Sequence, residues 1–300
     1  MERLRWREMR SQSKSNDRTF VIQLLIIAVL IGILYAPVFP TLWEDWNQDP
    51  NYGHGVFVPF LTAFLVWWKR DTIQEIKPEP YGPGLFVVLL GIILCLIGMA
   101  GNERFTMRAS MIVVIFGVFM SLLGMRGAKV LSFPVFYLLL MIPLPYIIYY
   151  AVASPMKLFA TKWAVFFVDL LRISVHNEGN IIYLSNTTLE VADACSGLRS
   201  LMSLFTFGLV FAYTAQRTFL CRSVLVTAII PIAIISNIIR IIITAMLAYY
   251  KGPETAHGFL HDTSGMVVYT VATVLIFGVN EILRKLNRQP PKKVQTPQSI

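Results

Sequence analysis

Three residues of this 300-residue chain carry side chains suited to covalent catalysis: Cys195, Arg240 and His261. A thiolate can attack a peptide carbonyl, a cation can stabilise the thiolate or the oxyanion, and a histidine can carry the proton. Each of the three lies in or beside a long apolar run, where ionisable groups are costly and usually have a function. Their pattern indicates acyl transfer if the elements that carry them bring them together.

Cys195 lies in the stretch 191–201, V-A-D-A-C-S-G-L-R-S-L, where a polar segment ends and an apolar run begins. If a helix starts near Asp193, Cys195 lies in its first turn, where unsatisfied N–H groups favour a thiolate. Arg199 then follows four residues later on the same face. The alternative is that the Cys-Ser-Gly sequence only lets helices approach closely. The stretch by itself favours neither interpretation.

Arg240 lies within the apolar run 220–249. It is about nine residues, or roughly 13 Å, from the outer end of that run at 1.5 Å per residue. An arginine at such a depth usually faces the interior of a helix bundle beside a partner. Asn237 lies one turn earlier on the same face and would support it. The alternative is a structural hydrogen bond or ion pair between helices.

His261 precedes the last apolar run, in a loop (253–265) whose N-cap-type residues start that run. His257 lies four residues earlier and could share its face, which raises the question of a metal site. No second group of histidine, cysteine or carboxylate side chains supplies a third and fourth ligand. We therefore predict neither a metal nor another cofactor.

The composition predicts a polytopic membrane protein. The chain is 56% hydrophobic and 14% charged, whereas soluble domains are about 25% charged, and several apolar runs reach the roughly 20 residues that span a bilayer. The net charge of +9 lies mainly in loops and tails beside these runs. This distribution is typical of membrane topology and not of nucleic-acid binding, so we expect no nucleic-acid partner.

Eight apolar runs are predicted to cross the membrane: 20–36, 52–68, 84–100, 109–124, 130–148, 196–214, 220–249 and 264–283. Eighteen or so polar residues precede the first run, and its end lacks a small-x-small cleavage site, so it is a retained anchor and not a signal peptide. With the amino terminus in the cytoplasm, the lysines and arginines of loops 69–77 and 126–129 fall inside. The loop 37–53 falls outside and contains no lysine or arginine. Arg104 and Arg108 fall outside as exceptions.

The stretch 150–172 decides the orientation of the rest. It carries Lys157, Lys162, Asp169 and Arg172, and prolines precede it. These charges disfavour a crossing and suit an amphipathic helix that lies in the membrane interface. With this helix outside, both termini are cytoplasmic and residues 149–195 lie on the outer face of the cytoplasmic (inner) membrane.

A small outer β-hairpin is predicted from Asn180–Leu184 and Thr187–Val191, β-favouring stretches that flank the polar pair Ser185-Asn186. The predicted fold is thus an all-α polytopic membrane protein with about eight transmembrane helices, one outer interfacial helix and this hairpin. We assign 1–18 to a basic cytoplasmic tail, 19–285 to one transmembrane domain and 286–300 to a disordered basic cytoplasmic tail.

Cys195 is the only one of three cysteines on the outer side of this topology, so no intramolecular disulfide partner is available there. Cys95 lies inside an apolar run and Cys221 near the cytoplasmic face, where cysteine is most often a small apolar residue. An unpaired thiol in an oxidising compartment is a liability unless it is used. The topology therefore favours the catalytic interpretation of Cys195.

The chain resembles the exosortase/archaeosortase family of multi-pass membrane cysteine transpeptidases. Five stretches carry the resemblance: Y-G-H-G-V-F-V-P (52–59), E-G-N-I-I (178–182), A-C-S-G-L-R-S-L (194–201), N-I-I-R (237–240) and F-L-H-D-T-S-G (259–265). The A-C-S-G-L-R-S-L stretch is the most specific of them. Together they cover about 50–285 in the order of the family.

The resemblance implies a Cys–Arg–His site at Cys195, Arg240 and His261, with Arg199 and Asn237 as supporting residues. His257 is the alternative histidine, although the spacing to Ser264-Gly265 favours His261. It further implies substrate proteins with a C-terminal sorting signal, made of a short motif such as Pro-Glu-Pro, a transmembrane helix and a basic cluster. Such an enzyme cleaves beside the motif on the outer face, through an acyl-enzyme thioester, and transfers the product to a lipid or envelope acceptor.

Two other classes of protein also fit an outer-facing arginine and histidine. A lipid or glycan transporter would use Arg240 to bind an anionic group, and an envelope polysaccharide polymerase or ligase would use both residues. Neither class needs a cysteine, so substitution of Cys195 separates them from a thiol protease or transpeptidase. No Gly-x-Ser-Gly occurs on a membrane run, which argues against a rhomboid-type serine protease.

Overall fold

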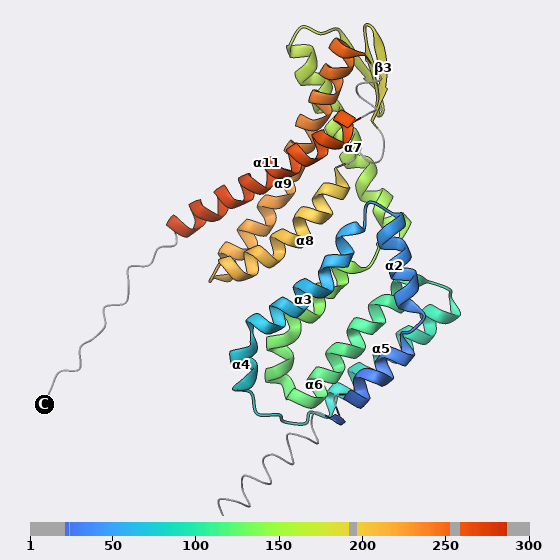
Figure 1. Ribbon diagram of the computed structural model, residues 1–300, viewed down its shortest axis with the longest axis vertical. Helices are drawn as coiled ribbons and strands as arrows, with labels where there is room; N and C mark the ends of the chain where they lie inside the picture. The colour runs from blue at the N-terminus through green and yellow to red at the C-terminus, as the bar shows by residue number, and fades with distance from the viewer. Residues whose placement is uncertain (1–21, 24, 192–196, 253–258, 287–300) are drawn as a thin grey trace, which may run out of the picture. The chain divides into compact units, whose positions relative to one another are not determined.

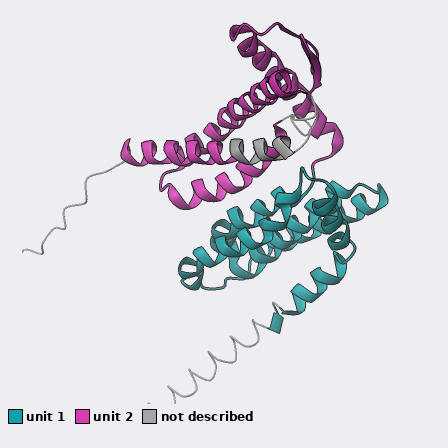
Figure 2. Cartoon of the chain, turned by 45° about the horizontal axis from the view of Figure 1, so that its top comes forward, with its two compact units in different colours: residues 1–143 teal, residues 144–300 magenta. Residues whose placement is uncertain are grey.

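The computed structural model describes residues 22–23, 25–191, 197–252 and 259–286, with the side chains of 259–268 excepted. The chain divides into two compact units, Met1–Pro143 and Leu144–Ile300 (Figure 2). The division falls in the sequence Pro143-Leu144-Pro145, where proline rings prevent one helix from continuing into the next. The boundary between the units falls inside the segment 19–285 that we assigned to one transmembrane domain.

Unit 1 is entirely helical over its described residues (Figure 1). Its elements in chain order are the helix Leu25–Leu34, α2 (Val38–Gln48), η1 (Gly53–Val56), α3 (Phe57–Trp68), α4 (Arg70–Gln74), α5 (Pro83–Ala100), α6 (Arg104–Tyr137) and η2 (Leu138–Met141). His54, which we expected to structure the first outer loop, is buried in η1.

Three glycines at seven-residue intervals bring α5 against α6. A Cβ on Gly91 would lie 2.6 Å from Val114 Cγ2, and one on Gly98 would lie 2.7 Å from the backbone nitrogen of Met107. Gly84 makes the corresponding contact with Ser121. The partners on α6 also recur every seven residues in the opposite order, so the helices run antiparallel with their backbones in close contact. Small residues serve this purpose in membranes, where apolar burial does not drive association.

We predict that Gly91→Ala lowers the stability of unit 1. The added methyl group meets the backbone of Val114 as well as its side chain, so α5 must move, and overpacking costs about 1–3 kcal/mol. The helix propensity of alanine offsets up to about 1 kcal/mol of this. Thermal unfolding of the detergent-solubilised protein measures the change. Gly32→Ala is the matched control, because a Cβ at Gly32 has no atom within 4 Å, and its melting temperature should not fall.

The 34-residue α6 is interrupted at Gly124, whose φ of +71° and ψ of −174° are non-helical. Its two arms, 104–123 and 125–137, correspond to the predicted runs 109–124 and 130–148. The second run ends earlier than predicted, however, because η2 finishes at Met141 and prolines follow. Glycine permits this backbone conformation, which costs other residues more.

The multi-pass membrane prediction is confirmed, whereas the number eight stays a prediction. Over the described residues, five helices are long and apolar enough to cross a bilayer: α5, α6 with η2, and Tyr146–Leu170, Leu198–Ala215 and Phe219–Lys251. A sixth span results if Leu25–Leu34 and Val38–Gln48, bent by 67°, count as one. The segment Gly53–Trp68 is apolar but shorter.

Unit 2 combines four helices with a small sheet over its described residues (Figure 1). Its elements are α7 (Tyr146–Leu170), β1 (Val175–Glu178), β2 (Ile181–Leu184), β3 (Thr187–Glu190), α8 (Leu198–Ala215), α9 (Phe219–Lys251) and α11 (Phe259–Leu286). Residues 150–170 of the stretch that we expected to lie in the interface belong to α7, one 25-residue helix with the length and composition of a span. Its interfacial position therefore stays a prediction.

The predicted hairpin is present as β2 and β3, joined through Ser185-Asn186 and paired in antiparallel register, with Leu184 opposite Thr187. A third strand that we did not predict, β1, pairs antiparallel with the other edge of β2. Ile182, Leu184 and Leu189 are buried while their neighbours along the strands are more exposed. The sheet thus turns one apolar face inward, as its alternating pattern requires.

One face of α9 contributes to two buried clusters. Its carboxy-terminal half packs with α7 and the sheet through Ile238, Ile241 and Ala245. Its amino-terminal half packs with α8 and α11 through Leu225 and Ile229. As a result, α9 is the central element of unit 2, and the sheet, α8 and α11 are all positioned by contacts with it.

A buried amide pair joins α11 to the end of α8. Gln216 Nε2 donates to Asn280 Oδ1 at 2.8 Å, and both side chains are buried. Arg222 Nε donates to the carbonyl oxygen of Gln216 at 2.9 Å and its guanidinium lies over the Tyr213 ring. Because a buried amide without a partner is costly, this group fixes the carboxy-terminal part of α11 against α8.

Candidate active site

Arg240 and Asn237 lie on the buried face of α9. Only 8% of Arg240 and 4% of Asn237 is exposed, and Ser236 beside them is buried as well. Neighbouring isoleucines in the sequence, Ile235 and Ile239, are exposed on another face of the helix. The prediction that Arg240 faces the interior with Asn237 on its face is therefore confirmed.

Gly197 places the start of α8 against this face of α9. Its φ is +81°, a left-handed conformation that favours glycine. A Cβ at Gly197 would lie 2.8 Å from Asn237 Cγ and 2.9 Å from Nδ2. Both the backbone conformation and the contact therefore require glycine at this position.

The start of α8 corrects one expectation from the sequence. We expected the helix to begin near Asp193, with Cys195 in its first turn and Arg199 one turn later on the same face. The helix begins at Leu198 after the left-handed Gly197, because that backbone conformation interrupts helical hydrogen bonding. Arg199 is the second residue of α8 and half-buried; its predicted relation to Cys195, which lies outside the described residues, stays a prediction.

The other end of the cysteine-containing stretch is held by the sheet. Val191, which follows β3, donates its backbone N–H to the carbonyl oxygen of Asn180 at 2.9 Å. Asn180 Nδ2 in turn donates to the carbonyl oxygen of Val191 at 3.2 Å. Val191 itself is buried in the same cluster as Ile238 and Ile241 of α9. Asn180 therefore fixes the chain beside the part of α9 that carries Arg240.

Cys195 and Asp193 lie outside the described residues, but both neighbours of the segment 192–196 are fixed. Val191 packs in a cluster with Ile238, and Gly197 contacts Asn237. The described residues on either side of this segment thus pack against the part of α9 that carries Asn237 and Arg240.

His261 is the third residue of α11, at the start of a helix as predicted. α11 packs against both α9 and α8, so the three predicted site residues belong to three mutually packed helices or to the connection that leads into one. The side chain of His261 is not described, and His257 lies outside the described residues.

We predict that Gly197→Ala impairs the site more than it destabilises the protein. The left-handed backbone costs alanine about 1–2 kcal/mol, and the methyl group must displace the buried Asn237 side chain. Gly179→Ala is the matched control: Gly179 has φ +60°, but a Cβ there has no atom within 4 Å. Gly197→Ala should lose somewhat more thermal stability than Gly179→Ala, because only its methyl group meets Asn237, and only Gly197→Ala should lose most of the activity. Equal activities would show that the Gly197–Asn237 contact is not functional.

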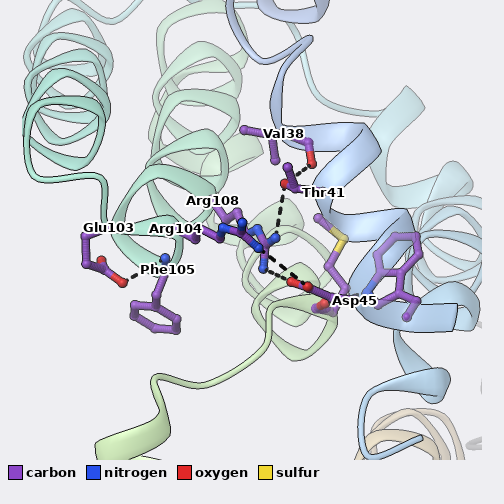
Figure 3. Close-up of polar contacts among 9 residues, drawn as sticks. Val38, Thr41, Asp45, Glu103, Arg104, Phe105 and Arg108 are labelled. Atoms are coloured by element: carbon purple, nitrogen blue, oxygen red, sulfur yellow. Dashed lines mark hydrogen bonds and ion pairs between the residues drawn. The ribbon is translucent and has the colours of Figure 1, made fainter. Parts of the chain in front are cut away.

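A second polar cluster, in unit 1, was not predicted from the sequence (Figure 3). Only 2% of the Arg108 side chain is exposed, and its Nη1 lies 2.6 Å from Asp45 Oδ2. Nη2 donates to Thr41 Oγ1 at 3.1 Å. Arg104 lies 3.8 Å from the same aspartate and is 60% exposed. The signal in the sequence was the four-residue spacing in both Thr41/Asp45 and Arg104/Arg108, which places each pair on one helix face.

This cluster explains why Arg104 and Arg108 depart from the expected charge distribution. Arg108 forms a buried ion pair with Asp45. This aspartate belongs to the predicted outer loop 37–53, which contains no lysine or arginine. Glu103 beside them caps α6 by accepting hydrogen bonds from the backbone of Phe105 and Thr106. Burial alone would raise the pKa of Glu103, but these hydrogen bonds and the charge of Arg108 outweigh it and lower that pKa.

Neither of the described cysteines lies at the candidate site. Cys95 is buried in α5 and Cys221 near the start of α9, in agreement with the structural role we expected. Over the part of the chain that the structure describes, no group of three histidine, cysteine or carboxylate side chains could hold a metal ion.

The fold and the site define a class: a multi-pass membrane protein with an arginine and an asparagine buried on one face of α9. Comparison with protein families identifies which one. The transmembrane exosortase family model matches residues 46–278, and the chain belongs to this family. The matched range includes Cys195, Arg240 and His261. No match is found among curated proteins or among solved structures. Membership supports a role as a membrane transpeptidase that sorts proteins.

Proposed function

We propose that the protein is a membrane-embedded cysteine transpeptidase that removes C-terminal sorting signals from envelope proteins. The observation that carries the proposal is that Val191 and Gly197, the described residues on either side of the cysteine-containing segment, both pack against the part of α9 that carries Arg240. A nucleophile in this segment needs a nearby cation to favour its thiolate form. A buried arginine supplies that cation without depending on pH.

In the proposed reaction, the Cys195 thiolate attacks the carbonyl carbon of the peptide bond after the sorting motif. The C–N bond breaks, and the amine of the departing tail helix takes a proton from His261. This leaves a thioester between Cys195 and the new carboxyl end of the substrate. An amine or hydroxyl acceptor then attacks the thioester and transfers its proton to His261, and the C–S bond breaks.

Arg240 is assigned to stabilise the thiolate and the oxyanion of each tetrahedral intermediate. Asn237 lies between Arg240 and Gly197 along the buried face of α9 and is assigned to orient the arginine. Arg199, at the start of α8, supports the same region. We place this site on the outer side of the cytoplasmic membrane, with both termini inside, following the distribution of lysine and arginine.

The proposed acceptor is a lipid or another envelope component, and water as acceptor would make the reaction a hydrolysis. A transpeptidase of this kind requires a covalent intermediate with the substrate, whereas a transporter or a polysaccharide polymerase does not. Asn180 receives a positioning role, because its two hydrogen bonds with Val191 fix the end of the connection that carries Cys195.

The test is co-expression with a tagged protein that ends in a motif, a transmembrane helix and a basic cluster. We expect loss of the tail, detected by the loss of an epitope placed after the helix. We also expect hydroxylamine to release the trapped product as a hydroxamate, because hydroxylamine cleaves thioesters. An intact tail with every tail-bearing host protein would contradict the proposal, as would processing without any hydroxylamine-sensitive intermediate.

A further inference from the structure

An apolar cavity of about 640 Å³ lies in unit 1, between the helix Leu25–Leu34, α2, α3 and α6. On α6 it extends from Met111 to Phe119, which corresponds to roughly 12 Å at 1.5 Å per residue. One wall is fixed by Trp46 of α2, whose Nε1 donates to the carbonyl oxygen of Met141 at 2.8 Å. The cavity is thus a formed feature of unit 1 and is lined by apolar side chains.

The arginines of this cluster (Figure 3) continue a stripe of α6 that lines the cavity. On α6, Arg104 and Arg108 precede Met111 and Ile115 at spacings of three and four residues, so the four share one stripe. On α2, Thr41 and Asp45 are adjacent in sequence to the cavity residues Leu42 and Trp46 and lie on a neighbouring face of that helix. The two arginines therefore lie beyond the end of the cavity on α6.

The charges of this cluster leave one arginine available to an external anion. Arg108 is occupied by Asp45 at 2.6 Å and by Thr41. Arg104 is only loosely paired with the same aspartate, at 3.8 Å, and most of its side chain is exposed. Two arginines are balanced by Asp45 and Glu103, so the attraction for a phosphodiester comes from the exposed guanidinium of Arg104 and not from an excess of positive charge. Trp43, at the cavity and largely exposed, is of the residue type that favours the membrane interface.

The lining of the cavity suits a hydrocarbon chain. Apolar side chains line it over about 12 Å of α6, and an extended hydrocarbon chain needs no hydrogen-bond partner along that length. An apolar chain attached to a phosphate matches both the cavity and the cation beyond its end.

We propose that this cavity is a specific phospholipid site, in which one acyl chain occupies the cavity and the phosphodiester binds Arg104. The lipid would come from the leaflet that meets the Arg104 end of α6. The inference rests on unit 1 alone and is independent of the proposed transpeptidase activity, because none of Cys195, Arg240 and His261 takes part in it.

Native mass spectrometry of the detergent-purified full chain tests the proposal, with phosphatidylethanolamine and a diacylglycerol of the same acyl chains as probes. We expect one tightly retained phosphatidylethanolamine per chain and about five- to tenfold weaker binding of the diacylglycerol, which lacks the phosphate. Arg104→Gln should reduce phosphatidylethanolamine binding to about the level of the diacylglycerol. Equal retention of the two lipids by the wild-type protein would overturn the proposal.

Gly32→Leu tests the acyl chain separately. Gly32 lines the cavity, and a Cβ there has no atom within 4 Å, so leucine fills the cavity without a backbone clash and favours the helix. We expect at least tenfold weaker retention of phosphatidylethanolamine with an unchanged melting temperature.

The matched control is Gly278→Leu in α11, where a Cβ also has no atom within 4 Å, and it should bind lipid as the wild type does. Undiminished lipid binding by Gly32→Leu would overturn the proposal. A second outcome would also overturn the proposal. In it, a synthetic peptide of the substrate's tail helix binds the wild type but not Gly32→Leu, while both proteins bind phosphatidylethanolamine equally.

Discussion

Replacement of Cys195 by alanine is expected to abolish tail removal in the co-expression assay. The thiol is the proposed nucleophile, and loss of a nucleophile reduces turnover by roughly 10⁵–10⁶-fold in hydrolases where it has been measured, which is below detection here. Cys195→Ser should be equally inactive, because a hydroxyl beside Arg240 does not ionise as a thiol does. The readout is the amount of substrate that retains its tail, together with the hydroxylamine-sensitive intermediate.

The controls for this result are Cys95→Ala and Cys221→Ala, which remove buried cysteines from α5 and α9. Both variants should process the substrate as the wild type does. Their thermal stability should fall modestly, because the smaller side chain leaves a cavity. If Cys195→Ala processes its substrate normally while Arg240→Ala does not, the site binds an anion and the transporter or polymerase interpretation replaces ours. A membrane-impermeant thiol reagent applied to intact cells should label Cys195 and thereby test its outer position.

Replacement of Arg240 by glutamine is expected to reduce processing by about 10²–10³-fold, the effect of losing one oxyanion donor. Arg240→Lys should retain part of the activity, because it keeps the charge but loses the planar, forked donor geometry. The pH profile distinguishes this role from a structural one. Without the arginine, the Cys195 pKa should rise, and activity should recover partly at higher pH, where the thiolate forms without help.

The matched control is Arg217→Gln, the same change at an exposed arginine between α8 and α9. It should leave both activity and its pH profile unchanged. A structural role for Arg240 would appear as a lower melting temperature for Arg240→Gln and Arg240→Lys alike, with no change in the pH profile of the remaining activity. That outcome would remove Arg240 from the proposed chemistry.

Local sequence patterns predicted much of unit 2. The alternation of apolar and polar residues around Ser185-Asn186 predicted β2 and β3 in their observed register, since two adjacent strands joined by a two-residue turn depend only on local sequence. β1 was missed, because the four residues Val175–Glu178 show little apolar alternation and pair only once β2 offers an edge. The buried orientation of Arg240 was likewise predictable, because an arginine amid isoleucines cannot face lipid without great cost.

Interruptions of the helices were harder to predict. The apolar pattern continues through Gly124 and begins before Gly197, yet both glycines adopt positive φ and break the helix. A hydropathy pattern reflects only the polarity of the residues. It therefore does not predict that a glycine in an apolar run will end a helix. What requires the break at Gly197 is its contact with Asn237, which is forty residues away in the sequence.

The sequence by itself determined that this protein crosses the membrane several times and that it resembles exosortases, and it predicted a cysteine, an arginine and a histidine as the site residues. These conclusions follow from composition, from the cost of charge in lipid and from motifs, all of which are local properties. Only the tertiary structure decided that α9 supports both ends of the cysteine-containing segment, that glycines spaced by seven residues join α5 to α6, and that Arg108 is neutralised by Asp45. Each of these depends on atoms brought together from distant parts of the chain, and such contacts are set by packing and not by any short stretch of sequence.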